Sequence, residues 1–470
     1  MTEDCYTGPA GTQGIGVCKQ GSRDCDASGH WTTCAGEVTP VQENCQTNPD
    51  ESCAPNCGEH VSHRAFFSDA EEYLENLAIA ANGDLLLIGN SVAGSGLDFG
   101  GGALNIQDDG QIVLARLLPT LGHVWSQTYP FTPVRSAVAS GNEIGVSGMA
   151  LVDTTVGGTA FVSGDRMFVR INAANGNILT ATKNLNTPYA LGSNPDGYFF
   201  EAARSGTNDV LLRRSGGAVD QTLTLWPSSS QIHVTGVEGF SGGAFVYGDF
   251  AGTLTATGGL SVSTTAGDGF VLKVVNGVAA ALVQLHATGA ATIRGSSFRN
   301  GDLYLVGGYT GGLPDPLTGM TALSQAGIDF YIARLQSAGS GLSLTWAKGF
   351  PGAGDAYSGP VVADPAGFVT VSVRAAGDSD FGGGVVPVMG PNTRVLASYK
   401  SDGTHAWSRR LTVWPSALAV DQTGRLFVGG GYSQAAALDF SGKDAFGSGV
   451  DLMGSMNEDI FVAALSPASP

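Results

Sequence analysis

One short pattern limits the fold of this chain more than any other feature: a turn that leads into an apolar strand recurs seven times after residue 70. Each copy is followed by a second segment in which apolar and polar residues alternate, as they do in a half-buried strand. The turn-and-strand copies are AANGDLLLIGN (80–90), ASGNEIGVSGM (139–149), SNPDGYFFEAA (193–203), EGFSGGAFVYGD (238–249), FRNGDLYLVGG (298–308), ADPAGFVTVSV (363–373) and DQTGRLFVGGG (421–431). The second segments are QIVLARL (111–117), DRMFVRI (165–171), DVLLRR (209–214), DGFVLKV (268–274), DFYIARL (329–335), TRVLASYK (393–400) and DIFVAAL (459–465). Because the copies recur at intervals of 45 to 65 residues, we interpret them as an internal repeat.

Two further strands complete each unit. One follows the second segment and often carries Trp, as in HVWSQTY (123–129) and HAWSRRL (405–411), and another precedes the turn, as in SALAV (416–420). No stretch with a helical period competes with this pattern. Seven units of four antiparallel strands predict an all-β, seven-bladed β-propeller, because a single blade cannot bury both of its faces.

The strand that trails each unit is found only six times after residue 70, since the chain stops soon after residues 459–465. A segment with similar basic and aromatic spacing, SHRAFFSD (62–69), lies upstream of the first unit. We therefore expect residues 62–69 to pair with residues 457–465 and to close the ring. This divides the chain into a Cys-rich module at residues 1–60 and a propeller at residues 61–470.

A second recurring element is the segment DFGG at 98–101, which returns at 380–383 and in a weaker form at 438–442. The tripeptide Asp-Phe-Gly belongs to a metal-binding loop in protein kinases, but such a loop is needed once, and no Gly-rich phosphate loop or His-Arg-Asp element accompanies it. Each copy follows the second strand of its unit, where glycine permits a positive φ and aspartate can accept hydrogen bonds from turn amides. The repetition predicts a structural turn whose phenylalanine packs between blades.

The turn DPAGFVTV, the DFGGG element, the D-x-F-V-A-R-L type of strand and the segment DGTHAWS resemble the bacterial seven-bladed β-propeller (SBBP) repeat family over about 400 residues. The segment at 8–40 looks like a Cys-rich module that precedes such repeats in large secreted bacterial surface proteins. The resemblance implies the propeller and an extracellular setting. It implies no activity, because a fold does not dictate a function.

All cysteines of the chain lie in the first 57 residues, in a segment with little apolar content. They are Cys5, Cys18, Cys25, Cys34, Cys45, Cys53 and Cys57. Disulfides often replace a hydrophobic core in small modules, so we expect three of them and an extracellular or cell-surface location. Because the number is odd, we expect Cys5, nearest the start, to remain unpaired, with Cys57 as the alternative. Residues 1–4 show no signal peptide, so we expect a mature or trimmed chain.

Two segments of the module contain residue types that bind metals. Asp24, Asp26 and Ser28 resemble the start of a calcium loop, but the twelfth position is Ala35 in place of the bidentate glutamate, so a plain β-turn is favoured and calcium is the alternative. The second segment has a spacing that fits no standard zinc module. Its residues are Cys53, Cys57, His60 and His63.

We find no catalytic constellation in the sequence. The letters GFSGG around Ser241 match a nucleophile elbow, but that elbow joins a strand to a helix and here a strand continues, so we expect a turn. Several aromatic residues occupy repeated loop positions, where they could stack on sugars or pack between blades, and we favour packing. They are Tyr189, Trp226, Tyr309, Tyr357, Trp414 and Tyr432.

The formal net charge of −18 argues against nucleic acid and against anionic membrane surfaces as partners. No apolar run is long enough to span a bilayer. We therefore predict a non-catalytic extracellular or cell-surface scaffold that binds a protein or glycan, without a cofactor. The alternatives are a polysaccharide-active enzyme with its site at the central funnel, which would show an acidic pair with raised pKa values, and a self-associating subunit of a surface layer or filament.

Overall fold

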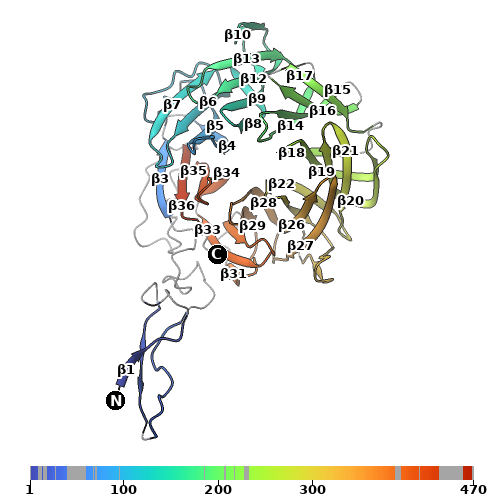
Figure 1. Ribbon diagram of the computed structural model, residues 1–470. Helices are drawn as coiled ribbons and strands as arrows, with labels where there is room; N and C mark the ends of the chain where they lie inside the picture. The colour runs from blue at the N-terminus through green and yellow to red at the C-terminus, as the bar shows by residue number, and fades with distance from the viewer. Residues whose placement is uncertain are drawn as a thin grey trace.

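The protein is an all-β propeller in which seven four-stranded antiparallel sheets surround a common centre, as the computed structural model shows (Figure 1). The described part of the chain contains strands and turns and no helix. It comprises residues 2–8, 13, 18–26, 28–39, 60–66, 68, 71–94, 96–184, 186–205, 208–215, 218–226, 232–325, 327–386, 393–411, 413–432 and 459–467. The predicted fold class is confirmed.

The first four blades follow one another along the chain, and each begins with the strand nearest the centre (Figure 1). Blade 1 contains β4 (Glu72–Ile79), β5 (Leu85–Ser91), β6 (Gln111–Leu117) and β7 (His123–Tyr129). Blade 2 contains β8 (Phe131–Ser140), β9 (Glu143–Ala150), β12 (Arg166–Asn172) and β13 (Ile178–Lys183). Blade 3 contains β14 (Thr187–Ser193), β15 (Phe199–Ser205), β16 (Asn208–Ser215) and β17 (Ala218–Thr224). Blade 4 contains β18 (Ile232–Phe240), β19 (Gly243–Thr255), β20 (Ser261–Val275) and β21 (Val278–Leu285).

The last three blades complete the ring. Blade 5 contains β22 (Ala291–Arg299), β23 (Asp302–Tyr309), β26 (Asp329–Ala338) and β27 (Gly341–Phe350). Blade 6 contains β28 (Ala356–Ala363), β29 (Val369–Ala375), β32 (Thr393–Tyr399) and β33 (His405–Leu411). Blade 7 contains β34 (Trp414–Val420), β35 (Leu426–Tyr432), β36 (Asp459–Leu465) and the N-terminal β3 (His60–Phe66).

The pairing of β3 with β36 closes the ring, as predicted. The two strands are antiparallel, with His63 opposite Ala463 and Phe66 opposite Ile460. The strand extends from residue 60 to residue 66, so it begins and ends slightly earlier than the expected segment. Without β3, strand β36 would present an unpaired edge to solvent, which makes a sheet prone to aggregate. Blade 7 therefore joins the two ends of the propeller sequence.

The blades pack face to face because each strand alternates two sets of side chains. On β29, Val369, Val371 and Val373 are buried against blade 5. The intervening residues of β29 point to the opposite side, toward blade 7, together with Leu396 of β32. Apolar clusters of this kind fill the spaces between neighbouring blades and form the core of the molecule.

The two faces of the ring differ in their connections. The innermost strand of every blade begins at one face, where the links from the second to the third strand also lie. We call this the loop face, and the opposite face, which carries the hairpin turns, the turn face. Three small ribbons in these links were not predicted from the sequence. They are β10 (Thr154–Val156) with β11 (Thr159–Phe161), β24 (Gly312–Pro314) with β25 (Thr321–Leu323), and β30 (Ser379–Asp380) with β31 (Val385–Val386).

The DFGG segments are turns, as predicted. Asp98 Oδ1 accepts hydrogen bonds from the backbone N–H groups of Gly100 and Gly102, at 2.6 and 2.9 Å. Both glycines have a positive φ, of 106° and 105°, which favours glycine over other residues. Phe99 is buried in the core between blades 7 and 1, where its ring lies 4.8 Å from that of Phe66 on β3.

The second segment repeats this geometry. Asp380 Oδ1 accepts hydrogen bonds from the N–H groups of Gly382 and Gly384, at 2.7 and 3.0 Å, and Phe381 packs against Phe350 of blade 5. The third copy, at 438–442, lies outside the described residues. In the two described copies the aspartate accepts hydrogen bonds within the turn and the phenylalanine packs against a neighbouring blade, so the geometry is explained without a metal.

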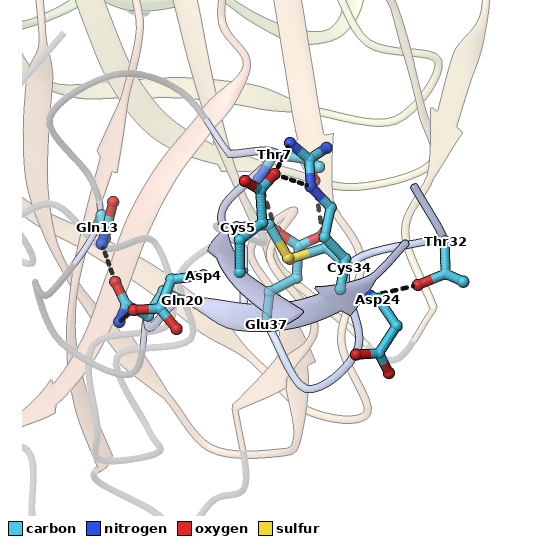
Figure 2. The surroundings of a disulfide bond; sticks show 11 residues. Asp4, Cys5, Thr7, Gln13, Gln20, Asp24, Thr32, Cys34 and Glu37 are labelled. Carbon is cyan, nitrogen blue, oxygen red and sulfur yellow. Dashed lines mark hydrogen bonds and ion pairs between the residues drawn. A yellow bond between two sulfur atoms is a disulfide. The ribbon is translucent and has the colours of Figure 1, made fainter. Parts of the chain in front are cut away.

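In the N-terminal module, β1 (Thr2–Cys5) pairs with β2 (Gly21–Asp24), and a disulfide joins Cys5 to Cys34 (Figure 2). The expectation that Cys5 is unpaired is therefore wrong. The pairing of the two strands brings Cys5 opposite residue 21, and a bridge from Ser22 to Ala35 places Cys34 beside it, with 5.8 Å between the two Cα atoms.

The other cysteines complete the comparison with the prediction. Among the described cysteines, the free thiol belongs to Cys25, and Cys18 is buried and disulfide-bonded. Cys45, Cys53 and Cys57 lie outside the described residues, and so does the alternative assignment of Cys57 as the unpaired cysteine.

Candidate binding site on the loop face

Three side chains lie next to one another across blade 6 at the loop face. Tyr357 on β28 is opposite Arg374 on β29, and Arg374 is opposite Arg394 on β32. Residues directly opposite each other in a sheet project to the same side, which here faces blade 7. Trp414, the first residue of β34 in blade 7, meets them there, with the Arg394 Cζ 3.5 Å from its ring centroid. We call these four residues the arginine–aromatic row.

The two arginines place positive charge at the blade interface, and no described residue supplies a counter-ion. Arg394 is only 5% exposed, and its Nη1 has no hydrogen-bond partner. The Nε of Arg374 is likewise buried without a partner. Burial, together with the positive charge of Arg374, lowers the pKa of Arg394 to about 10. Like charges on opposite residues of a sheet are destabilising, so this arrangement opposes folding.

Aromatic rings offset part of this cost. The Arg374 Cζ lies 5.5 Å from the centroid of the Tyr357 ring, and Arg394 lies over Trp414. Such cation–π contacts contribute about 0.5–2 kcal/mol each. A nearby carboxylate, Asp355, forms no ion pair in the described part of the chain, since it accepts hydrogen bonds from the Tyr357 hydroxyl and from the backbone of Ile328.

Other blades show what usually occupies the position of Arg394. In three blades the residue at the same register is apolar and buried against the next blade; these residues are Ile112, Phe330 and Ile460. In blade 3 it is Asp209, which forms an ion pair with its opposite residue Arg204 at 3.2 Å. Blade 4 has Gly269 and blade 2 has Arg166 at this register, but Arg166 is exposed, whereas Arg394 is buried.

The aromatic residues singled out from the sequence divide into two groups. Trp226, Tyr309 and Tyr432 are buried, and the half-buried Tyr189 packs against the core between blades 3 and 4, as favoured. In contrast, Trp414 is 52% exposed and Tyr357 is 39% exposed, although both belong to inner strands. These two rings are therefore available for contact with a ligand at the loop face, and the preference for packing was wrong at these two positions.

The inner strands bear on the enzyme alternative. Glu238 on β18 accepts hydrogen bonds from the Ser296 hydroxyl and the Phe298 N–H of blade 5, and burial raises its pKa to about 7. No second carboxylate among the described residues influences that pKa. The acidic pair expected of a glycoside-cleaving enzyme is therefore not formed around Glu238 by the described part of the inner strands.

The remaining predicted site residues have structural contacts. Ser241 lies in the turn between β18 and β19, where its hydroxyl donates to Asp196 Oδ1 at 2.8 Å. The carboxylate of Asp26 accepts the N–H groups of Ser28 and His30 and so forms a turn. The backbone N–H of Asp24 is 2.9 Å from the hydroxyl oxygen of Thr32 (Figure 2). Calcium at this turn stays a prediction.

The four residues weighed as zinc ligands, whose spacing fits no standard zinc module, are only partly described. His60 and His63 both lie on β3, where the Nε2 of one is 2.8 Å from the Nδ1 of the other. Burial lowers the pKa of both rings. Their expected companions, Cys53 and Cys57, lie outside the described residues. Within the described ranges, no group of three or more His, Cys, Asp or Glu side chains has the arrangement of a metal site.

Hollows also occur between other blades, and two of them contain basic side chains. A pocket of about 230 Å³ opens between blades 3 and 4 at the turn face. Its charged residues already have partners, because Arg213 forms an ion pair with Asp220 and Asp196 accepts a hydrogen bond from the Gly242 N–H. A groove of about 510 Å³ lies between the outer strands of blades 5 and 6 beside Lys348. The corresponding position between blades 7 and 1 is occupied by Arg64 on the outer strand β3. Arg64 precedes the buried Phe66 by two residues, just as Lys348 precedes the buried Phe350 on β27.

No family model and no curated protein matches the chain. Three solved structures resemble it at 9–10% identity. BamB from Moraxella catarrhalis has a TM-score of 0.39 and is 10% identical, with 87% of this chain and 97% of that chain covered. The Cps50 (Swd1) β-propeller domain from Myceliophteria thermophila has a TM-score of 0.44 and is 9% identical, with 86% and 99% covered. Quinohemoprotein alcohol dehydrogenase from Comamonas testosteroni has a TM-score of 0.38 and is 9% identical, with 92% and 79% covered.

Similarities at this level carry no argument about function, which has to be inferred from the site itself. The resemblance to the SBBP repeat family is supported by the seven-bladed architecture and by no family model. The part of the chain that the structure describes includes no helix with the length and apolarity needed to cross a membrane.

Proposed function

We propose that the protein is a non-catalytic, extracellular or cell-surface scaffold that binds its ligand at the loop face of blades 6 and 7. The observation that supports this most is the arginine–aromatic row, which combines two exposed rings with two arginines that have no acidic partner in the described part of the chain. Groups arranged in this way oppose folding, and a bound ligand would relieve the opposition. Functional sites are the places where proteins retain such costs.

Binding fits the row better than catalysis does. Arg374 and Arg394 are always-charged donors that can hold an anion, and neither acts readily as a general acid or base at neutral pH. The Asp355 carboxylate, which accepts a hydrogen bond from the Tyr357 hydroxyl, is a single acidic group, whereas glycoside cleavage uses a pair. The row therefore offers orientation and charge, which are the attributes of a binding surface.

The extracellular setting rests on the Cys-rich module and on the resemblance to secreted bacterial surface proteins. The disulfide between Cys5 and Cys34 supports an oxidising compartment, where such bonds persist. In this setting the accessible partners are other surface proteins and glycans, and the exposed rings of Tyr357 and Trp414 suit both.

A glycan and protein array tests the proposal. The wild-type protein should give defined signals that the double variant Tyr357→Ala, Trp414→Ala loses. Tyr73→Ala is the matched control, because Tyr73 is equally exposed at the same face on the inner strand of blade 1. Signals that survive the double variant, or that Tyr73→Ala removes equally, would contradict binding at the row. Turnover of an array glycan would favour the enzyme alternative.

A further inference from the structure

We propose that the arginine–aromatic row binds a carboxylate-bearing sugar, such as a uronic acid residue of a glycan. This inference rests on the proposed function and names the chemical class of its ligand. The carboxylate would lie against the guanidinium groups of Arg374 and Arg394, and the pyranose ring would stack on Trp414 or Tyr357.

The charge of the site indicates an anion. Two guanidinium groups face the same side of blade 6, and no ion pair to either exists among the described residues. The nitrogens Arg374 Nε and Arg394 Nη1 are buried without an acceptor. The planar fork of a guanidinium matches the two oxygens of a carboxylate, so one carboxylate between these arginines would neutralise charge that no described residue compensates.

The rings indicate a sugar. Arg394 covers part of Trp414, and about half of the Trp414 surface is exposed. Tyr357 lies at the opposite end of the row and is also exposed. Flat aromatic surfaces with a polar surrounding favour ligands that present an apolar face and polar edges, as a pyranose ring does.

The dimensions of the row agree with a short oligosaccharide. From Tyr357 to Arg394 the row crosses from β28 over β29 to β32, two strand spacings or about 10 Å, and Trp414 adds a further contact beyond them. A carboxylate bound at the arginines in the middle leaves an aromatic ring on each side. Neighbouring sugar units can therefore stack while the acidic unit is held by charge.

The charge of the whole protein restricts which anion can bind. A net charge of −18 repels ligands with a high density of negative charge, and nucleic acids need an extended positive surface that this row does not provide. An acidic peptide offers a carboxylate on a flexible chain without a rigid apolar face beside it. A sugar that carries a single carboxylate per ring meets both restrictions.

Blade 3 supplies an internal comparison. Arg204 and Asp209 occupy the register positions that Arg374 and Arg394 occupy in blade 6, and there an ion pair closes the site. In blade 6 an arginine replaces the aspartate, so a carboxylate from a ligand could take the part that Asp209 has in blade 3. The substitution Arg204→Met is consequently a control that removes a loop-face arginine without touching the proposed site.

The experiment compares ligands that differ only in the carboxylate. Trisaccharides of galacturonic acid and of glucuronic acid, and their fully methyl-esterified counterparts, are titrated into the full chain by calorimetry with a metal chelator present. We expect the acids to bind and the esters to bind at least tenfold more weakly. Arg394→Met and Arg374→Met should each weaken acid binding about 10- to 100-fold, as the loss of a charge-assisted hydrogen bond does, with Arg204→Met unchanged.

Conservative variants keep the test independent of folding. Arg374→Lys and Arg394→Lys retain the charge and lose the planar fork, so we expect intermediate affinity for the acids at an unchanged melting temperature. Equal binding of acid and ester, or wild-type affinity in Arg394→Met, would overturn the proposal.

Three further outcomes separate this inference from the proposed function. Binding of a hexaglutamate peptide in place of the sugar acids would overturn the sugar assignment, while loss of that binding in Trp414→Ala would still support a scaffold at the row. Array signals that depend on Trp414 but show no dependence on carboxylates would overturn this inference alone. Array signals that are independent of the row would overturn both.

Discussion

Two buried arginines with opposite surroundings allow a direct test of the site. Arg214 in blade 3 is 3% exposed and donates two hydrogen bonds to Glu201 Oε2, at 2.7 and 3.0 Å. Arg394 is 5% exposed and has no carboxylate partner among the described residues. The same substitution, Arg→Met, should therefore have opposite effects on stability at the two positions.

The magnitudes follow from what each substitution leaves behind. Arg214→Met leaves Glu201, which is fully buried, with the Ser147 hydroxyl and the Asn184 amide as its donors among the described residues, and removing one partner of a buried pair costs about 3–5 kcal/mol. Arg394→Met removes a buried charge whose desolvation costs several kcal/mol and a cation–π contact worth about 2 kcal/mol at most. We expect Arg394→Met to be neutral or to stabilise the protein by about 1–2 kcal/mol.

Urea unfolding of the wild type and both variants measures these differences, with the slope m as the check that the same surface unfolds in each. A rise or no change in the midpoint for Arg394→Met, with a clear fall for Arg214→Met, is the expected result. If Arg394→Met destabilised the protein as much as Arg214→Met, then Arg394 would have a structural partner, and the argument that the row retains charge for a ligand would be refuted.

Three further predictions concern single contacts. Glu238→Gln should make the stability of the protein less dependent on pH. In the wild type, folded Glu238 has a pKa of about 7 and keeps a proton between pH 4.5 and 7 that the unfolded chain releases, so stability falls by up to about 3 kcal/mol as the pH rises through this range. Melting curves at each pH measure this fall, and equal pH dependence in both proteins would refute it. Asp98→Ala and Asp380→Ala should each cost about 0.5–1.5 kcal/mol without changing ligand binding, and a binding loss at unchanged stability would contradict the turn assignment. Arg64→Lys should lower the melting temperature because it loses a 3.0 Å hydrogen bond to a backbone carbonyl, and Lys348→Arg should raise it by filling the groove between blades 5 and 6; effects of the opposite sign would refute the equivalence of the two places.

Much of the fold could be predicted because the same sequence pattern, a turn followed by an apolar strand and an alternating strand, occurs seven times. The segments 111–117, 405–411 and 459–465 were predicted as strands with the bounds that β6, β33 and β36 have. The closing strand could be inferred because the seventh unit lacks its fourth strand after residue 465, and a segment of similar pattern lies upstream of the first unit. The two- and three-residue ribbons of the loop face could not be predicted, since so few residues show no periodicity.

The candidate site was only half visible in the sequence. Tyr357 and Trp414 attracted attention as aromatic residues near turns, but Arg374 and Arg394 did not, because 20 positions separate them and only strand register brings them together. An alignment of the copies in register places Arg394 with the apolar Ile112 and also with Arg166 of blade 2, so the burial of Arg394 had to come from the structure.

The disulfide could not be predicted for a similar reason. Sequence spacing alone leaves fifteen pairings open for six cysteines, and proximity to the start of the chain proved a poor guide to the unpaired one. Cys5 meets Cys34 because β1 pairs with β2 and because a bridge joins Ser22 of β2 to Ala35. Neither pairing has a strong sequence pattern.

Closure of the ring by its own N-terminal strand is the central structural claim, and the melting temperatures of two truncated proteins test it most directly. Removal of residues 1–57 keeps β3, and removal of residues 1–67 deletes it together with Phe66, whose burial against Phe99 contributes about 3–5 kcal/mol by comparison with Phe-to-Ala substitutions. We predict that the shorter truncation melts at the temperature of the full propeller. The longer truncation should melt well below it or aggregate through the exposed edge of β36. Equal melting temperatures for the two truncated proteins would contradict closure by β3.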